Sequence, residues 1–133
     1  MGASLHVTII DDDRSVGTAI GALLTSQGYQ TEVYASADEF IERVSQSEAA
    51  CLIVDVQLGK QTGIELGHQL TSLGYTFPII FMTGSDSLSL QKQATAFGCV
   101  AYLRKPIEPD RLSKAIAEAV GQPQRPFLGF GGR

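Results

Sequence analysis

The chain has 133 residues, of which 44% are hydrophobic and 18% are charged, and its formal net charge is −4. This length and apolar content predict one globular domain with a single core rather than a disordered chain. The acidic balance argues against a nucleic-acid-binding module, which carries a basic surface. Every apolar run is too short to cross a membrane, and Met1–Ser4 lacks the features of a secretory signal, so we expect a cytoplasmic protein.

The first half of the chain alternates between apolar runs and segments of helical periodicity. Leu5–Ile10 is apolar and rich in β-branched residues, which favours a strand, and Arg14–Gln27 carries apolar residues at helical spacing before Gly28. Thr31–Tyr34 is a shorter and more polar strand, as expected near the edge of a sheet. Ser36 is a suitable N-cap for a second helix. The inward positions of that helix are Phe40, Ile41 and Val44.

The second half continues the alternation with three more strands. Cys51–Val54 and Phe77–Met82 have the continuous apolar character of buried parallel strands, and Val100–Leu103 is the fifth strand. Between them, Thr62–Leu73 is a helix followed by Gly74. The apolar positions of this third helix are Ile64, Leu66, Leu70 and Leu73.

The last two helices differ in character. Ser87–Phe97 is rich in Ser, Gln and Thr and has only a thin apolar stripe, whereas Pro109–Val120 begins with a proline, which is favourable in a first helical turn. The inward positions of the last helix are Leu112, Ile116, Ala119 and Val120. The regular strand–helix alternation predicts a five-stranded, doubly wound parallel α/β sheet with helices on both faces, for which we expect the strand order 2-1-3-4-5.

We expect one domain over residues 1–121 and a flexible tail over residues 122–133. The tail is rich in Pro and Gly, which indicates a linker stub, a disordered terminus or a remnant of the expressed sequence. Phe127, Leu128 and Phe130 are unusual for an inert linker and favour, as an alternative, contact with the domain surface.

The two cysteines, Cys51 and Cys99, begin the third strand and precede the fifth. In the expected order these strands are two spacings apart, roughly 9–10 Å, which is too far for a disulfide. We therefore predict two small buried hydrophobic residues.

Acidic residues cluster directly after the first strand. One aspartate suffices to cap the following helix, and Asp13 is placed to do so. Asp11 and Asp12 remain, and adjacent carboxylates repel each other unless a cation compensates them. Oxygen-only ligands are typical of Mg²⁺ or Mn²⁺ sites, so the turn is either a metal site or simply an acidic cap.

Asp55 ends the third strand and strengthens the metal interpretation. A carboxylate at the end of a buried strand is costly unless it is paired or functional. The third strand lies beside the first in the expected order, so Asp55 converges on Asp11 and Asp12. A carboxylate can also attack a phosphoryl donor, and the backbone carbonyl of Gln57 is placed to complete a metal shell.

Thr83 and Lys105 follow the fourth and fifth strands. Alone, Thr83 is a locally satisfied hydroxyl and Lys105 a solvated surface lysine. Because ligands bind at the carboxyl ends of strands in open α/β sheets, the two together supply a hydroxyl and a positive charge that suit phosphoryl oxygens.

With these residues the sequence resembles the receiver domains of two-component response regulators, over Leu5 to Val120. The resemblance implies a flavodoxin-like fold with five flanking helices, a cis Lys105–Pro106 bond and seven matched positions. These are the acidic metal-binding pair Asp11 and Asp12, the phosphoacceptor Asp55, the switch hydroxyl Thr83, the lysine Lys105, the switch aromatic Tyr102, and Gly63 at the start of the third helix.

The resemblance also implies a function and its partners. Such a domain takes a phosphoryl group from a histidine kinase or a histidine phosphotransfer protein with Mg²⁺ or Mn²⁺, and catalyses only its own phosphorylation and slow dephosphorylation. It would then switch the face formed by the fourth helix, fifth strand and fifth helix, where we expect a partner or homodimer contact. No nucleic acid and no membrane are expected as direct partners of this chain.

Leu58-Gly59 departs from the family, which commonly has a proline at the second of these positions. Glycine removes the φ restraint of proline and widens the accessible conformations. The stiffness of this loop and the lifetime of the phosphoryl group are therefore open.

Two other functions compete with this interpretation. A non-phosphorylated interaction module with the same fold is disfavoured, because the five chemical positions are intact. A flavin carrier would need a Ser/Thr/Gly-rich phosphate loop after the first strand, where this chain carries Asp11, Asp12 and Asp13.

Overall fold

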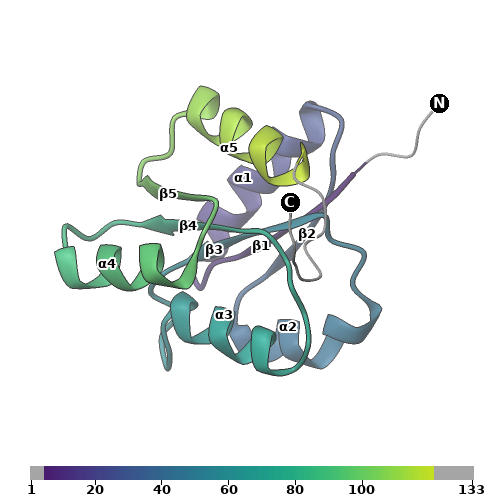
Figure 1. Cartoon of the computed structure of the whole chain (residues 1–133). Coiled ribbons are helices and arrows are strands. Elements are labelled where there is room, and N and C mark those ends of the chain that lie inside the picture. Colours follow the sequence, from purple (N-terminus) through teal and green to yellow (C-terminus); the bar gives the residue numbers. More distant parts are fainter. Residues whose placement is uncertain (1–4, 122–133) are drawn as a thin grey trace.

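Five parallel strands form one sheet in the order β2-β1-β3-β4-β5 in the computed structural model, which describes residues 5–121 (Figure 1). Each strand pairs in parallel with its neighbours. The strands are β1 (His6–Ile10), β2 (Gln30–Tyr34), β3 (Cys51–Asp55), β4 (Ile79–Thr83) and β5 (Ala101–Arg104). The predicted doubly wound sheet and its strand order are confirmed.

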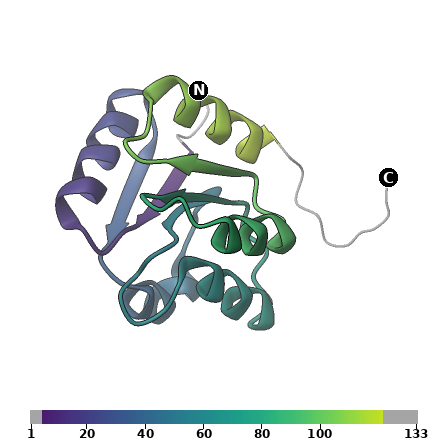
Figure 2. The same cartoon turned by 90° about the vertical axis from the view of Figure 1, so that its left-hand side faces the viewer.

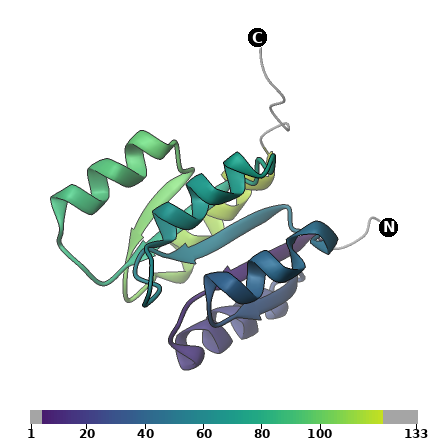
Figure 3. The same cartoon turned by 90° about the horizontal axis from the view of Figure 1, so that it is seen from below.

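Helices cover both faces of this sheet. They are α1 (Arg14–Ser26), α2 (Ala37–Arg43) with the short 3₁₀ turn η1 (Val44–Gln46), α3 (Gly63–Ser72), α4 (Leu88–Phe97) and α5 (Pro109–Gly121). Helices α1 and α5 lie on one face and α2 and α3 on the other, which Figure 2 shows from the side. Helix α4 lies at the β4–β5 end of the sheet, next to α3 (Figure 3).

The core consists of two apolar clusters, one on each face of the sheet. The α2–α3 face includes Phe40, Leu66 and Phe81, and the α1–α5 face includes Ile9 and Ile116. Strands β3 and β4 are buried along their whole length because both faces are covered. Their last residues, Asp55 and Thr83, therefore bring polar groups to the end of an otherwise apolar layer.

The structure corrects one predicted core position and several boundaries. Leu73 was expected to face inward, but its side chain is 54% exposed, because α3 ends at Ser72 and Leu73 is the C-cap residue that precedes Gly74. Strand β4 begins at Ile79 rather than at Phe77, because Phe77 precedes Pro78 and stacks on Tyr75 instead. Helix α2 is shorter than expected, and Val44 enters the core from η1.

Other expectations concern the cysteines and the chain ends. Cys51 and Cys99 are both free thiols, as predicted, but only Cys51 is buried, whereas Cys99 is partly exposed at the edge of the core. Within residues 5–121, none of the helices combines the length and the apolar character that a membrane crossing requires. The expected tail and its surface contact lie outside the described residues.

Candidate functional site

Three carboxylates meet at the carboxyl ends of β1 and β3. Asp11 and Asp12 follow β1, Asp55 ends β3, and each contributes an oxygen within 4.8 Å of the others. The two strands are hydrogen-bonded neighbours, with Ile10 opposite Val54, so the predicted convergence is confirmed. Asp11 is fully buried and Asp55 is 5% exposed, whereas Asp12 faces solvent.

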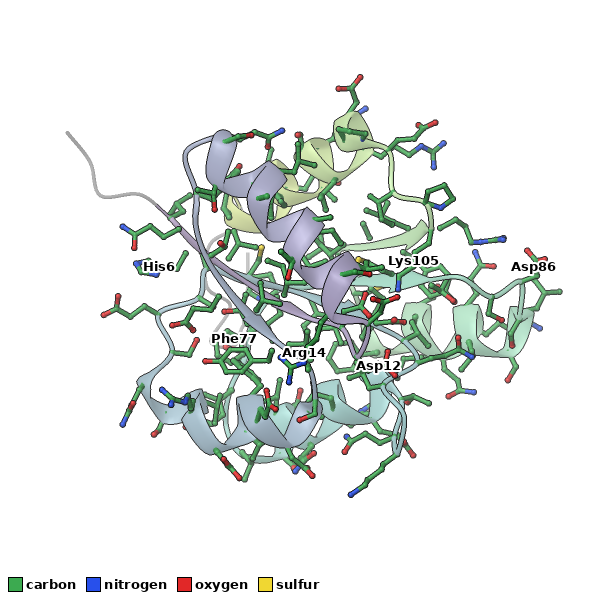
Figure 4. All side chains as sticks on the ribbon, turned by 180° about the vertical axis from the view of Figure 1, so that it is seen from behind. His6, Asp12, Arg14, Phe77, Asp86 and Lys105 are labelled. Carbon is green, nitrogen blue, oxygen red and sulfur yellow. The ribbon has the colours of Figure 1, made fainter. Side chains whose placement is uncertain are left out.

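Lys105 lies between two of these carboxylates. Its Nζ is 2.9 Å from Asp11 Oδ2 and 2.8 Å from Asp55 Oδ2. Burial opposes the ammonium charge, but the hydrogen bonds to Asp55 and Asp11 outweigh it, so the pKa of Lys105 is raised. The backbone N–H of Lys105 donates to the carbonyl of Thr83 (2.8 Å), which fixes the start of the β5–α5 loop. Figure 4 shows Lys105 and Asp12 at the same end of the sheet, with His6 at the opposite end.

The three consecutive aspartates have different roles. Asp13 is the N-cap of α1, and its Oδ1 accepts from the Ser15 and Val16 N–H groups, as predicted. The Ser15 hydroxyl hydrogen bond lowers the pKa of Asp13. Burial raises the pKa of Asp11, although hydrogen bonds from Lys105 and from the Asp13 N–H act in the opposite direction. Burial thus disfavours the ionised form of Asp11, an effect that a bound cation would offset.

The loop after β3 is a tight turn that requires a glycine. The Gln57 N–H donates to Asp55 Oδ1 (2.9 Å), and Gln57 and Thr62 form an antiparallel bridge across the turn. Gly59 has a φ of +78°, which proline cannot adopt because its ring holds φ near −65°. The departure from the family at this position is therefore a different turn, closed by backbone hydrogen bonds such as that from the Leu58 N–H to the Gln61 carbonyl.

Gly63 places the start of α3 directly against β3. A Cβ at this position would lie inside contact distance of the Asp55 carbonyl oxygen and 2.7 Å from Val54 Cγ1. The Gly63 N–H also donates to the Val56 carbonyl (2.7 Å). Resemblance alone indicated this glycine, and the structure supplies the steric reason.

The remaining predicted residues lie on the β4–β5 side. Thr83 is fully buried, and its Oγ1 accepts from the Ser85 N–H (2.9 Å). Tyr102 packs against the α2–α3 face, and its hydroxyl is buried with no hydrogen-bond partner among the described residues. Arg104 pairs with Asp86 in the β4–α4 loop, a link that no sequence motif indicated. The predicted Lys105–Pro106 cis bond is present.

The donor set fits a small hard cation. Three carboxylates face one ammonium group, which leaves two negative charges in excess at a rim that is largely buried. Oxygen ligands without sulfur or imidazole are typical of Mg²⁺ sites, which combine one or two carboxylates with water and phosphate oxygens.

A family model described as the response regulator receiver domain matches residues 7–117. The chain belongs to the response regulator receiver family. This receiver is 34% identical over 114 residues to the response regulator protein TodT of Pseudomonas putida, covering 86% of the chain and 50% of TodT. It is 32% identical to the transcriptional regulatory protein FixJ of Bradyrhizobium diazoefficiens, covering 88% of the chain and 57% of FixJ. The chain thus spans about half the length of these relatives.

Solved structures agree with the fold of this receiver. A receiver protein from Burkholderia phymatum is 36% identical with a TM-score of 0.79, covering 89% of this chain and 96% of that chain. The N-terminal part of FixJ is 25% identical with a TM-score of 0.84, covering 94% of this chain and 99% of that chain. The receiver is therefore part of the response regulator side of two-component signalling.

Proposed function

We propose that this receiver accepts a phosphoryl group on Asp55 from the phosphohistidine of a histidine kinase or histidine phosphotransfer protein. The observation that carries the proposal is the position of Lys105 Nζ between Asp11 and Asp55, within a cluster of three carboxylates. An ammonium group and excess negative charge at one rim suit a cation and a phosphoryl group together.

The proposed transfer involves only the phosphohistidine donor and Asp55. A carboxylate oxygen of Asp55 forms a bond to phosphorus while the phosphorus–nitrogen bond of the donor breaks, and the electron pair stays on the imidazole nitrogen. Asp55 is 5% exposed, so only a small part of its surface is available for this attack. The domain acts on itself and on no further substrate. Because a phosphohistidine draws its phosphoryl group from ATP, we also place the reaction in the cytoplasm.

A divalent cation, Mg²⁺ or Mn²⁺, would be held by Asp11 or Asp12, by Asp55 and by the backbone carbonyl of Gln57. When bound, the cation offsets the negative charge of the carboxylates and of the incoming phosphoryl oxygens. Lys105 already contacts Asp55 Oδ2, so a small movement brings its ammonium group to a phosphoryl oxygen. The Thr83 hydroxyl now accepts a hydrogen bond from the Ser85 N–H, and it would give up that bond to bind another phosphoryl oxygen.

The proposed output is a change of the face formed by α4, β5 and α5. The phosphoryl group adds about two negative charges at the rim. Thr83 turns toward it and changes the space beside Tyr102, which lies on the next strand. A partner or homodimer contact on this face would respond to that change.

Intact mass spectrometry tests the proposal. Incubation with a small phosphodonor and Mg²⁺ should add one phosphoryl group to the wild-type chain and none to Asp55→Asn. Asp13→Asn is a matched control, because Asp13 caps α1 and should leave the yield unchanged. A wild-type yield in Asp55→Asn would assign the acceptor elsewhere, and no mass increase in the wild type would favour the non-phosphorylated interaction module.

A titration with Mg²⁺ tests the proposed metal ligands separately. Asp12→Ala should weaken Mg²⁺ binding strongly and leave the fold intact, because Asp12 is exposed and has no part in the core. An unchanged Mg²⁺ affinity in Asp12→Ala would remove this residue from the ligand set.

A further inference from the structure

An apolar groove lies between α1 and the β5–α5 loop. It encloses about 500 Å³, and its lining includes Val16, Ala19, Ile20, Leu23, Ile107 and Leu112. Among the described residues of the lining, Lys105 alone is charged, and its ammonium group contacts Asp55. This volume lies within the range of about 300–1,000 Å³ that is typical of ligand pockets. The groove is therefore large enough to hold bulky side chains beside the phosphoacceptor.

The groove is open in the described part of the chain. Ala19 is exposed, and Val16, Leu23 and Ile107 are only half-buried, although they pack on the core beneath them. Apolar residues at this spacing form a stripe along the side of α1 that lines the groove. Closing the groove over such a stripe would remove apolar surface from water, which is favourable.

The chain itself supplies a segment of matching chemistry directly after α5. Residues 122–133 follow Gly121 and include the apolar run Phe127, Leu128 and Phe130. The same segment contains Arg125 and Arg133 and no acidic residue. Of the chain's 10 basic and 14 acidic residues, 8 and 14 then fall in residues 1–121, so a basic segment follows an acidic domain.

The distances allow this segment to return to the groove. Leu112, which lines the groove, is nine residues before Gly121 on α5, which corresponds to about 14 Å along a helix. The six residues from Gly121 to Phe127 span up to about 20 Å when extended. A short tether also holds the segment at a local concentration on the order of millimolar, so even weak contacts suffice for substantial occupancy.

We propose that residues 126–130 bind back into this groove, with Phe127 and Phe130 occupying the space beside Leu23 and Ile107. The docking does not depend on phosphorylation, so it stands or fails independently of the proposed function.

Paramagnetic relaxation on the full 133-residue chain tests the docking. A nitroxide on Gly131→Cys, in a Cys99→Ala background, should broaden the amides of Ala19 and Leu23 several-fold more than that of Ser72, which lies on α3. Cys51 needs no substitution, because burial raises the pKa of its thiol to about 12 and keeps it unreactive. The same label with Phe127→Ser and Phe130→Ser should lose the difference between α1 and α3.

Three outcomes would overturn the proposal. Equal broadening of α1 and α3 in the labelled chain that keeps Phe127 and Phe130 would show that the groove does not bind this segment. Broadening centred on another surface would place the segment elsewhere. Broadening of Ala19 in an isotope-labelled chain caused only by a separate spin-labelled chain, in a mixture of the two, would make the occupant a second copy.

Discussion

Helices α3 and α4 have the same length, ten residues, but they are attached to the domain very differently. Helix α3 buries Gly63, Ile64, Leu66, Gly67 and Leu70 and begins with a capping box between Thr62 and Glu65. Helix α4 buries only Ala94 and begins with a single cap from Ser87. Figure 3 shows α4 at the far end of the sheet from α2.

The difference separates the α3 side of the site, which we call the fixed side, from the α4 and β5 side, which we call the movable side. Helix α3 follows the loop after Asp55, so its packing helps to hold Asp55 in place. Helix α4 follows the loop after Thr83, and the ring of Phe97 at its end packs on Gly67 and on Phe81. Elements with few buried contacts open at low free energy, so we expect structural change after phosphorylation to concentrate in α4.

The largest expected effect is a difference in the free energy of unfolding between one leucine variant of α3 and one of α4. Leu66→Ala should lower the free energy of unfolding by about 3 kcal/mol, because it leaves a cavity under α3. Leu90→Ala should cost about 1 kcal/mol, because Leu90 of α4 is only half-buried and its site can collapse. Urea unfolding of both variants measures the difference. Equal losses would mean that α4 is attached as firmly as α3.

A glycine pair gives the next largest effect. Gly63→Ala should cost about 2 kcal/mol, because the new Cβ presses on the Asp55 carbonyl and on Val54. Gly84→Ala, at the corresponding loop before α4, is the control, because its Cβ would meet no atom within 4 Å. Thermal unfolding should separate the two variants. A stable Gly63→Ala chain would show that α3 can move away from β3.

Asp11, which lies beside Asp55 in the carboxylate cluster, carries a charge that burial disfavours. Burial raises the pKa of Asp11, so the folded state prefers the protonated carboxyl and loses stability as the pH rises through that pKa. Asp11→Asn should therefore raise the free energy of unfolding at pH 7 without a divalent cation. The gain should shrink as the pH falls below the raised pKa of Asp11, toward the ordinary value of 3.8.

Urea unfolding from pH 4 to pH 8 measures this dependence, with Asp13→Asn as the control. The hydrogen bond from Ser15 lowers the pKa of Asp13, so that carboxylate stabilises the fold at neutral pH and its variant should show no gain. A pH-independent gain in Asp11→Asn would assign the effect to packing rather than to the buried charge.

The sequence located the chemical positions of the site because apolar runs end directly at them. The strand before Asp55 is uniformly apolar, and parallel strands bring Asp11 and Asp55 to one edge whatever the loops do. The positive φ of Gly59 could not be predicted, because it depends on how the loop closes against α3. The outward position of Leu73 was missed because periodicity does not show at which turn a helix ends.

The sequence patterns also could not predict the polar contacts of the movable side. Asp86 and Arg104 are 18 positions apart, and neither neighbours a motif that indicates their pairing. Periodicity places Tyr102 on a face of β5, but it does not show whether the hydroxyl finds a partner. Side-chain contacts between elements depend on tertiary packing, which a pattern of apolar residues does not encode.

The smallest expected effect concerns Tyr102 on the movable side. The Tyr102 hydroxyl is buried without a hydrogen-bond partner in the described residues, which costs free energy because water can no longer solvate it. Tyr102→Phe keeps the ring packed on the α2–α3 face and removes the hydroxyl, so it should raise the free energy of unfolding by roughly 0.5 kcal/mol. Tyr34→Phe is the control, because the Tyr34 hydroxyl donates to Glu32 (3.1 Å) and its removal should bring no gain. A loss of stability in Tyr102→Phe, measured by urea unfolding, would show that the hydroxyl has a partner such as water and that more than packing holds this residue inward.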